Sequence, residues 1–212
     1  ITTSYNTTGT RELNIKLTLP GEFSVYNSLC AIAVSEHFNV DDKLLLDALY
    51  NTRVAGRVEP VKVSDDFIVM IDYAHNAMSL ESLLSTLREY NPNRIVCLFG
   101  CGGNRSKLRR FEMGEVSGRM ADLTIITSDN PRDEDPALIM QDIETGIKKT
   151  SGSYVMIEDR GEAVKYAIEH GEKGDIIVLA GKGHEDYQEI KGIRYHQTDK
   201  ELVQKAMEEL AR

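Results

Sequence analysis

The sequence predicts an α/β fold in which a mostly parallel sheet carries helices on both faces. From residue 56 onward, short apolar runs alternate with stretches of helical length and periodicity, which is typical of parallel strands joined by crossover helices. The run at 122–127 is short, apolar and β-branched, as expected of a buried strand. Because such crossovers are right-handed, the carboxyl ends of the strands should share one edge of the sheet.

Length, charge and cysteine usage narrow the class of protein. The 212 residues suffice for one large domain or for one and a half. The formal net charge is −9, with acids and bases interspersed, which argues against a nucleic-acid partner. The three cysteines have no zinc spacing, so we expect a reduced, cytoplasmic protein with no metal ligands on this chain. We expect neither a signal peptide nor a membrane span.

The first 55 residues predict one strand and two helices. Residues 1–12 are polar and predict no element, whereas apolar and polar residues alternate over 12–19 and predict a half-buried strand. Residues 24–37 predict a buried helix, and 41–51 predict a second, short one. The apolar side of the first helix should hold Val25, Leu29, Ile32 and Ala33. This block is too small to be a convincing domain by itself.

The remaining residues predict alternating strands and helices. The expected strands are 67–73, 95–99, 123–127, 154–157 and 176–180. The expected helices are 79–90, 109–120, 136–149, 161–170 and a last one that starts after Thr198-Asp199. Asp135 and Asp159 should cap the helices that follow them, and a polar hairpin should turn at Lys191-Gly192. Four loops, at 72–75, 100–105, 128–132 and 181–185, should then meet at one sheet edge, where a binding site is expected.

The loop that follows strand 123–127 carries the most informative set of side chains. Asp129, Asn130 and Arg132 offer an anion, an amide and a bidentate cation within four residues. Such a set suits a small zwitterion, because the carboxylate can bind an ammonium and the guanidinium can bind a carboxylate. The alternative is a plain Asn-Pro turn with solvated charges.

The other three loops could each contribute to a binding site. Gly102-Gly103 would let backbone N–H groups approach an anion, with Arg105 adding a positive charge; a tight turn with a surface arginine is the alternative. Glu185 could face an ammonium, unless the loop at 181–185 is only a glycine turn. Asp72 could accept hydrogen bonds from a ribose. His75 could act as a catalytic group, although a lone histidine more often makes local hydrogen bonds. The chain contains neither a P-loop nor the dinucleotide-binding fingerprint.

Six short stretches in this order resemble the Mur ligase family. They are 20–27 (PGEFSVYN), 56–59 (GRVE), 72–75 (DYAH), 100–105 (GCGGNR), 129–132 (DNPR) and 181–185 (GKGHE). The resemblance extends from about Leu13 to the C-terminus and is nearest to the branch that adds the third residue of the peptidoglycan stem peptide. It implies a Rossmann-like C-terminal domain at 56–212, and at 1–55 the remnant of a central ATPase domain whose P-loop lies upstream.

The resemblance also implies a reaction. ATP, with Mg²⁺, would phosphorylate a carboxylate of UDP-MurNAc-L-Ala-D-Glu, and the amine of meso-diaminopimelate would attack the acyl phosphate. Most ligands of ATP and Mg²⁺ would belong to the upstream part, so this chain should be inactive without the remaining domains of the ligase. Alternatives are a lysine-adding ligase, a stand-alone amino-acid-binding or sensor module, and a folate-glutamate ligase, against which the sequence 129–132 argues.

Site residues follow from the matching positions. The resemblance implies that Asn27 contacts the adenine and that Arg57 and Asp72 contact the ribose across the domain junction. It implies an amino-acid pocket formed by Arg105, Asp129, Asn130, Arg132, Gly181 and Glu185. In that pocket the two arginines would hold the distal carboxylate of meso-diaminopimelate, and Asp129 or Glu185 would face its ammonium. Lysine has no distal carboxylate, so an arginine at 132 favours meso-diaminopimelate.

Overall fold

The computed structural model describes residues 3–7 and 12–211, which form two compact units, residues 1–54 and 55–212. Each unit has its own core, and each is described separately. The assignment of the first unit to a central ATPase domain, and of the second to a complete C-terminal domain, stays a prediction.

The first unit is a two-stranded ribbon with two helices. Strand β1 (Thr3–Asn6) pairs antiparallel with β2 (Asn14–Leu17), and α1 (Glu22–His37) and α2 (Asp42–Asn51) follow. The predicted alternation is confirmed, since Leu13, Ile15 and Leu17 are buried against Leu45 of α2. We did not predict β1: its polar residues carry no alternating pattern, and only pairing with β2 defines the strand. The rest of the predicted polar stretch, 1–2 and 8–11, lies outside the described residues.

The predicted apolar side of α1 is wrong. Of Val25, Leu29, Ile32 and Ala33, only Ile32 is buried, and Leu29 is 40% exposed. The buried face consists instead of Ser24, Ser28, Ile32 and Ser35. The three serine hydroxyls donate to backbone carbonyls of their own turns at 2.7–2.8 Å, so burial leaves them paired. Apolar residues occur around the whole helix, and their spacing therefore does not select one face.

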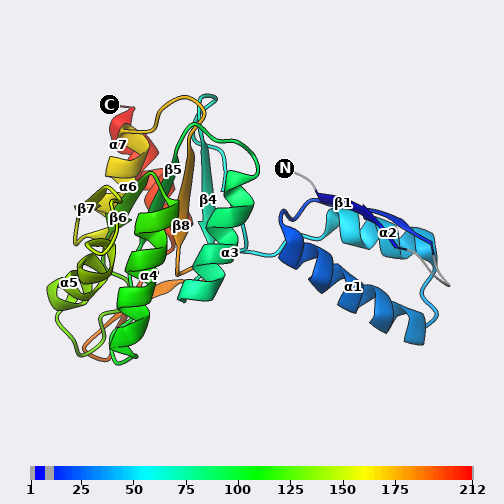
Figure 1. The fold of residues 1–212 in the computed structure, drawn as a ribbon, viewed down its shortest axis with the longest axis horizontal. Helices are drawn as coiled ribbons and strands as arrows, with labels where there is room; N and C mark the ends of the chain where they lie inside the picture. Colours follow the sequence, from blue (N-terminus) through cyan, green and yellow to red (C-terminus); the bar gives the residue numbers. More distant parts are fainter. Residues whose placement is uncertain (1–2, 8–11, 212) are drawn as a thin grey trace. The chain divides into compact units, whose positions relative to one another are not determined.

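The second unit is built on a six-stranded sheet, which confirms the predicted α/β fold (Figure 1). The strand order is β3 (Glu59–Val61), β4 (Ile68–Asp72), β8 (Ile176–Ala180), β5 (Ile95–Phe99), β6 (Leu123–Ile126) and β7 (Tyr154–Met156). All neighbours are parallel except β3, which runs antiparallel to β4 at the edge. We did not predict β3, because it is short and contains Pro60, a residue that edge strands tolerate.

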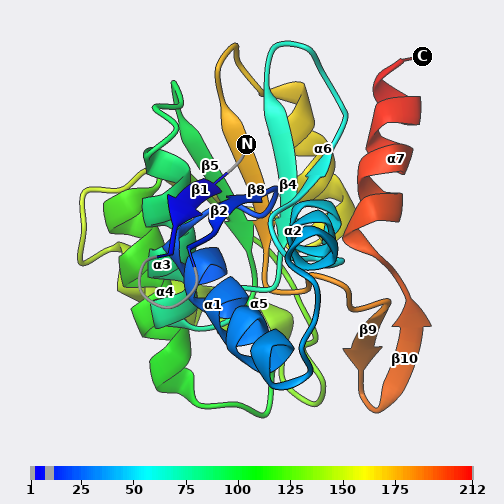
Figure 2. The same ribbon diagram turned by 90° about the vertical axis from the view of Figure 1, so that its right-hand side faces the viewer.

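Helices cover both faces of this sheet, as predicted (Figure 2). The helices α3 (Ala77–Arg88), α4 (Lys107–Met120) and α5 (Pro136–Ile147) lie on one face. On the other, α6 (Arg160–Glu169) and α7 (Asp199–Leu210) pack on the sheet through small side chains such as Ala163, Ala167 and Ala206. Of the described residues, no helix is both long and apolar enough to cross a membrane.

Local signals place the helix ends where the sequence predicts them. The Asp135 side chain accepts from the Ala137 N–H at 2.8 Å, and Asp159 accepts from the Glu162 N–H at 2.9 Å, so both act as N-caps. The predicted hairpin is also present: β9 (Tyr187–Ile190) and β10 (Ile193–His196) turn at Lys191-Gly192. These ends fix the loops at the carboxyl edge of the sheet.

Candidate functional site

The four predicted loops meet at the carboxyl edge of the sheet and enclose a cleft of about 270 Å³. They follow β4, β5, β6 and β8. The predicted pocket residues Arg105, Asp129, Asn130, Arg132, Gly181 and Glu185 all line the cleft, and so does His75. The loops therefore bring together cationic and anionic side chains that are far apart in the sequence.

Arg132 is held in an unusual backbone conformation. Its φ is 51°, a left-handed conformation that costs about 1 kcal/mol for a side chain of this kind. The N–H of Arg132 donates to Glu189 O at 2.9 Å, and Lys191 N–H donates to Arg132 O at 2.8 Å. These two bonds, one to β9 and one to the turn that follows it, stabilise the conformation of Arg132, whose side chain lines the cleft.

The guanidinium of Arg132 lies against the glycine loop. Its Nη1 donates to Gly103 O at 2.9 Å, and its Nε lies 3.6 Å from Oε2 of Glu189. A Cβ at Gly102 would lie 2.7 Å from this Nη1, so glycine at 102 leaves room for the guanidinium. Among the described residues the Nη2 group makes no hydrogen bond, so it could donate to a carboxylate.

Asn130 joins three segments of the cleft wall. Its side chain is 3% exposed, its Nδ2 donates to Glu185 Oε2 at 2.9 Å, and its Oδ1 accepts from Glu189 N–H at 2.8 Å. Its backbone carbonyl accepts from Gly103 N–H at 2.8 Å. Both ends of the amide are therefore occupied, and Asn130 fixes the positions of the groups that would contact a ligand.

Two carboxylates face the cleft. Asp129 is 8% exposed and its Oδ1 accepts from the N–H of Asn130. Glu185 is held from two sides, by Asn130 and by the Tyr73 hydroxyl, whose oxygen lies 3.4 Å from Oε1. Gly181 adopts a φ of 105°, and a Cβ there would lie 3.2 Å from Oδ2 of Asp129. The two acids offer a place for an ammonium group.

Arg105 provides a cation with no internal partner. It lines the cleft, it is exposed, and within the described part of the chain its guanidinium makes no hydrogen bond or ion pair. Arg105 and Arg132 come from different loops, so a ligand carboxylate between them could accept from both.

The predicted ribose contacts differ in their surroundings. Asp72 is 6% exposed, and its two oxygens accept from the N–H groups of Val58 at 2.9 Å and Ala74 at 2.8 Å. Burial raises the pKa of Asp72, and these two bonds oppose that rise. Arg57 is exposed, and its guanidinium carbon lies 4.9 Å from the centre of the Tyr73 ring. Asp72 thus anchors the loop of Val58, whereas Arg57 lies against the Tyr73 ring and remains exposed to solvent.

His75 and Asn27 remain predictions with different settings. The Nδ1 of His75 lies 2.9 Å from Tyr73 O. Nδ1 must carry a proton to donate to this carbonyl, and in a neutral imidazole Nε2 is then the acceptor. The imidazole is exposed at the rim of the cleft. Asn27 is an exposed residue of α1 and belongs to the first unit.

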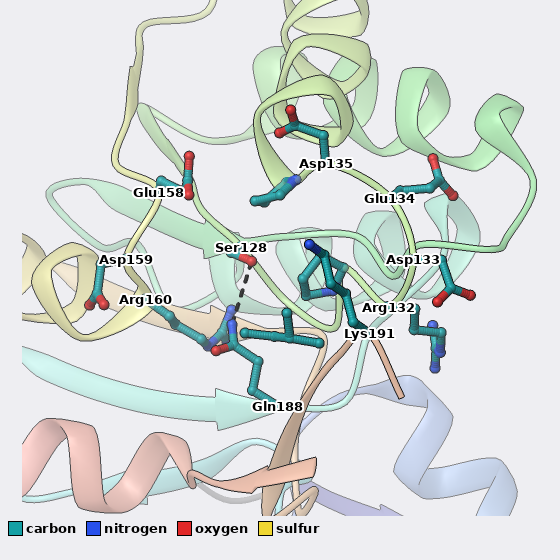
Figure 3. A pocket seen from close by; sticks show the side chains of 13 residues that line it. Ser128, Arg132, Asp133, Glu134, Asp135, Glu158, Asp159, Arg160, Gln188 and Lys191 are labelled. Atoms are coloured by element: carbon teal, nitrogen blue, oxygen red, sulfur yellow. Dashed lines mark hydrogen bonds between the residues drawn. The ribbon is translucent and has the colours of Figure 1, made fainter. Parts of the chain in front are cut away.

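A second, larger cavity of about 650 Å³ shares Arg132 with the cleft (Figure 3). Gln188 Nε2 lies 3.4 Å from Ser128 Oγ in its wall. Two of its carboxylates, Asp135 and Asp159, are the N-caps of α5 and α6, so they serve the helix ends. Both cavities contain opposed charges, but of the two it is the smaller cleft that all four predicted loops line.

Sequence reasoning missed several residues that shape the cleft. Gln188 donates to Asp129 O at 2.9 Å, and Glu189 contacts Arg132. Both belong to the predicted polar hairpin, but no local pattern indicates that β9 packs along the loop at 128–132. Tyr73 and Lys182 lie inside recognised stretches, and only their contacts reveal a role. Among the described residues, no group of three or more His, Cys, Asp or Glu could hold a metal ion.

The fold and the cleft define an α/β domain suited to a small ligand with both charges. The sequence model of the family described as "Mur ligase, glutamate ligase domain" matches residues 56–183. The chain belongs to the Mur ligase family.

Individual relatives agree with this assignment. The chain is 46% identical over 195 residues to the UDP-N-acetylmuramoyl-L-alanyl-D-glutamate–2,6-diaminopimelate ligase of Caldanaerobacter subterraneus subsp. tengcongensis, covering 92% of this chain and 40% of that protein. It is 41% identical to the protein of the same name from Aquifex aeolicus, covering 93% and 40%. A solved structure of a ligase with this name matches with a TM-score of 0.72 at 34% identity, covering 99% and 43%. The chain thus spans about two fifths of the length of these relatives.

Proposed function

We propose that this chain is the C-terminal part of an ATP-dependent ligase that adds meso-diaminopimelate to UDP-MurNAc-L-Ala-D-Glu, and that its own task is to bind the incoming diamino acid. The observation that carries the proposal is the convergence of Arg105 and Arg132 with Asp129 and Glu185 in one cleft. The names of the relatives, which specify 2,6-diaminopimelate, support the choice of substrate.

The distal end of meso-diaminopimelate is a zwitterion, with a carboxylate and an ammonium on one carbon. Arg132 and Arg105 would bind the carboxylate, while Glu185 or Asp129 would bind the ammonium. Lysine ends in an ammonium alone and would leave both guanidinium groups without an anion. A polar site that loses one partner of a charged pair rejects the ligand strongly.

The nucleotide and the metal would be held mainly by the remaining domains of the ligase. Arg57 is exposed and could contact a ribose, whereas a sugar hydroxyl would have to reach an Asp72 carboxylate that is 6% exposed. The Mg²⁺ that accompanies ATP would be bound mostly by those other domains. When bound, ATP would supply the phosphoryl group that activates the acceptor carboxylate.

Calorimetric titration of this chain with meso-diaminopimelate and, in parallel, with L-lysine tests the proposal. The parent chain should bind meso-diaminopimelate more tightly. Replacing Arg132 by Ala should weaken that binding by about 10- to 100-fold, since a hydrogen bond to a charged group contributes about 1.5–3 kcal/mol. Arg132→Lys should lose part of the affinity, because a lysine keeps the charge but not the paired donors.

Arg119→Ala is the matched control, since Arg119 lies on α4 and its one ion pair among the described residues is with Glu115 at 3.5 Å. It should bind like the parent. Equal affinity of the parent and Arg132→Ala for meso-diaminopimelate would refute the pocket assignment. A preference of the parent for lysine would keep the family and change the substrate.

A further inference from the structure

The loop that follows β8 buries a lysine, Lys182, between two residues that line the cleft, Gly181 and Glu185. Lys182 stands between Gly181 and Gly183, whose φ angles of 105° and 51° bend the chain sharply. Its side chain is 0% exposed, its Nζ donates to Tyr187 O, and the same Nζ lies 3.8 Å from Oε2 of Glu185. A lysine almost never loses all contact with water unless its charge is balanced.

The surroundings of Lys182 identify what balances it. Glu185 Oε2 lies 3.8 Å from its Nζ, and the charges of Asp129, Glu185 and Asp199 favour the ammonium form whereas that of Arg160 disfavours it. Burial lowers the pKa of Lys182, and the nearby Asp129 and Glu185 oppose that effect. Arg160 and Asp199 already satisfy each other through hydrogen bonds of 2.6 and 2.7 Å. Glu185 is therefore the counter-ion in direct reach of Lys182, and the charge of Asp129 adds to its effect.

The cleft carboxylates need such a cation when no ligand is present. Two acids in one small cleft repel each other, and a nearby cation relieves that repulsion. Of the arginines that line the cleft, Arg132 and Arg105 are assigned by the proposed function to the ligand's own carboxylate. Lys182 is buried and does not line the cleft, so its charge can offset those of Glu185 and Asp129 without taking the place of a ligand.

We propose that Lys182 is a positioning residue for ammonium recognition: it holds the Glu185 carboxylate in place and keeps the pair formed with Asp129 ionised, so that the empty cleft is ready for a ligand ammonium. This inference rests on the proposed function, because the ammonium belongs to the incoming diamino acid. A compact ammonium with three donors suits the role, since it can contact Tyr187 O and Glu185 from one point.

The first test compares the parent with Lys182→Met by calorimetry with meso-diaminopimelate, in buffers of different ionisation enthalpy. The parent should bind with no net proton change at roughly pH 6 to 8. The variant should bind at least about tenfold more weakly near pH 6, release protons on binding and recover affinity as the pH rises. Lys165→Met, which removes the 2.8 Å pair with Glu209 away from the cleft, should match the parent. Parent-like affinity and proton count in Lys182→Met would overturn the inference.

A second test needs no ligand and separates this inference from the proposed function. In the free chain, the side-chain NMR signal of the Lys182 ammonium should be protected from exchange with water. Glu185→Gln should shift that signal and leave the signal of Lys165 unchanged. Should the parent bind neither diamino acid, the proposed function fails, and an unshifted Lys182 signal in Glu185→Gln would refute the contact.

Discussion

Replacing Asp199 by Asn would break its buried ion pair with Arg160, which lies next to the end of β8 and hence next to the loop at 181–185. Arg160 and Asp199 both have fully buried side chains, and the guanidinium donates to the two carboxylate oxygens at 2.6 and 2.7 Å. Arg160 also donates to Ala180 O at 3.2 Å, at the last residue of β8. The substitution leaves the arginine charge buried without its counter-ion.

The free energy of unfolding should fall considerably, although Asp and Asn have nearly the same size and shape. Removing one partner of a buried pair costs about 3–5 kcal/mol, because the remaining charge is not solvated. The Nη1 of Arg160 already has no hydrogen-bond partner among the described groups, so the site cannot readily absorb further loss. For a unit of 158 residues, from 55 to 212, this corresponds to a fall in Tm of about 6–20 °C.

Amide hydrogen exchange of β8 and α7 measures this effect within the second unit. Protection there should fall by about a hundred-fold to a few thousand-fold. Arg119→Gln is the control, because it removes an exposed pair at 3.5 Å and should cost no more than about 0.5 kcal/mol. If Asp199→Asn and Arg119→Gln lowered protection equally, the reasoning from burial would be refuted.

Two further predictions concern the glycine loop and the thiols. Gly103→Ala would place its Cβ 1.9 Å from Pro131 O, so we expect the free energy of unfolding, measured with denaturant, to fall by about 1–3 kcal/mol. The control is Gly192→Ala, with φ 77° and open space around its Cβ, which should cost about 1 kcal/mol. An equal loss in the two variants would contradict the steric argument. Burial raises the pKa of Cys101 to about 12, whereas Cys30 is exposed. An alkylating reagent at about pH 8 should therefore label Cys30 and spare Cys101, as peptide mass spectrometry would show; rapid labelling of Cys101 in the folded chain would contradict its burial.

The sequence predicts the second unit well, because its elements are local. The five predicted strands are short, mainly apolar runs, and the helices α3, α5, α6 and α7 each begin at a capping side chain, so periodicity and end signals act together. The cleft edge follows from topology, since right-handed crossovers place all the loops on one side. Arg132 and Glu185 could therefore be expected at this edge, where both line the cleft.

Features that depend on distant partners could not be predicted in the same way. Strands β1 and β3 form by pairing and carry no pattern of their own. The serine face of α1 is buried because each hydroxyl satisfies a carbonyl of its own turn, whereas hydrophobic spacing treats serine as exposed. Of the charges that act on the buried Lys182, Glu185 is local, but Asp129, Arg160 and Asp199 belong to other loops and helices and lie outside any short window around residue 182.

The bonds between β9 and the loop at 128–132 have a consequence for any attempt to change selectivity. Glu189 contacts the loop at 128–132 through both its backbone and its carboxylate. Strand β9 and this loop therefore form one structural unit. A different side chain at 132 would inherit a left-handed backbone held open for arginine by a strand almost sixty residues away. Transplanting residues 128–132 and 187–191 together should therefore reshape the pocket, whereas single exchanges should mostly damage it.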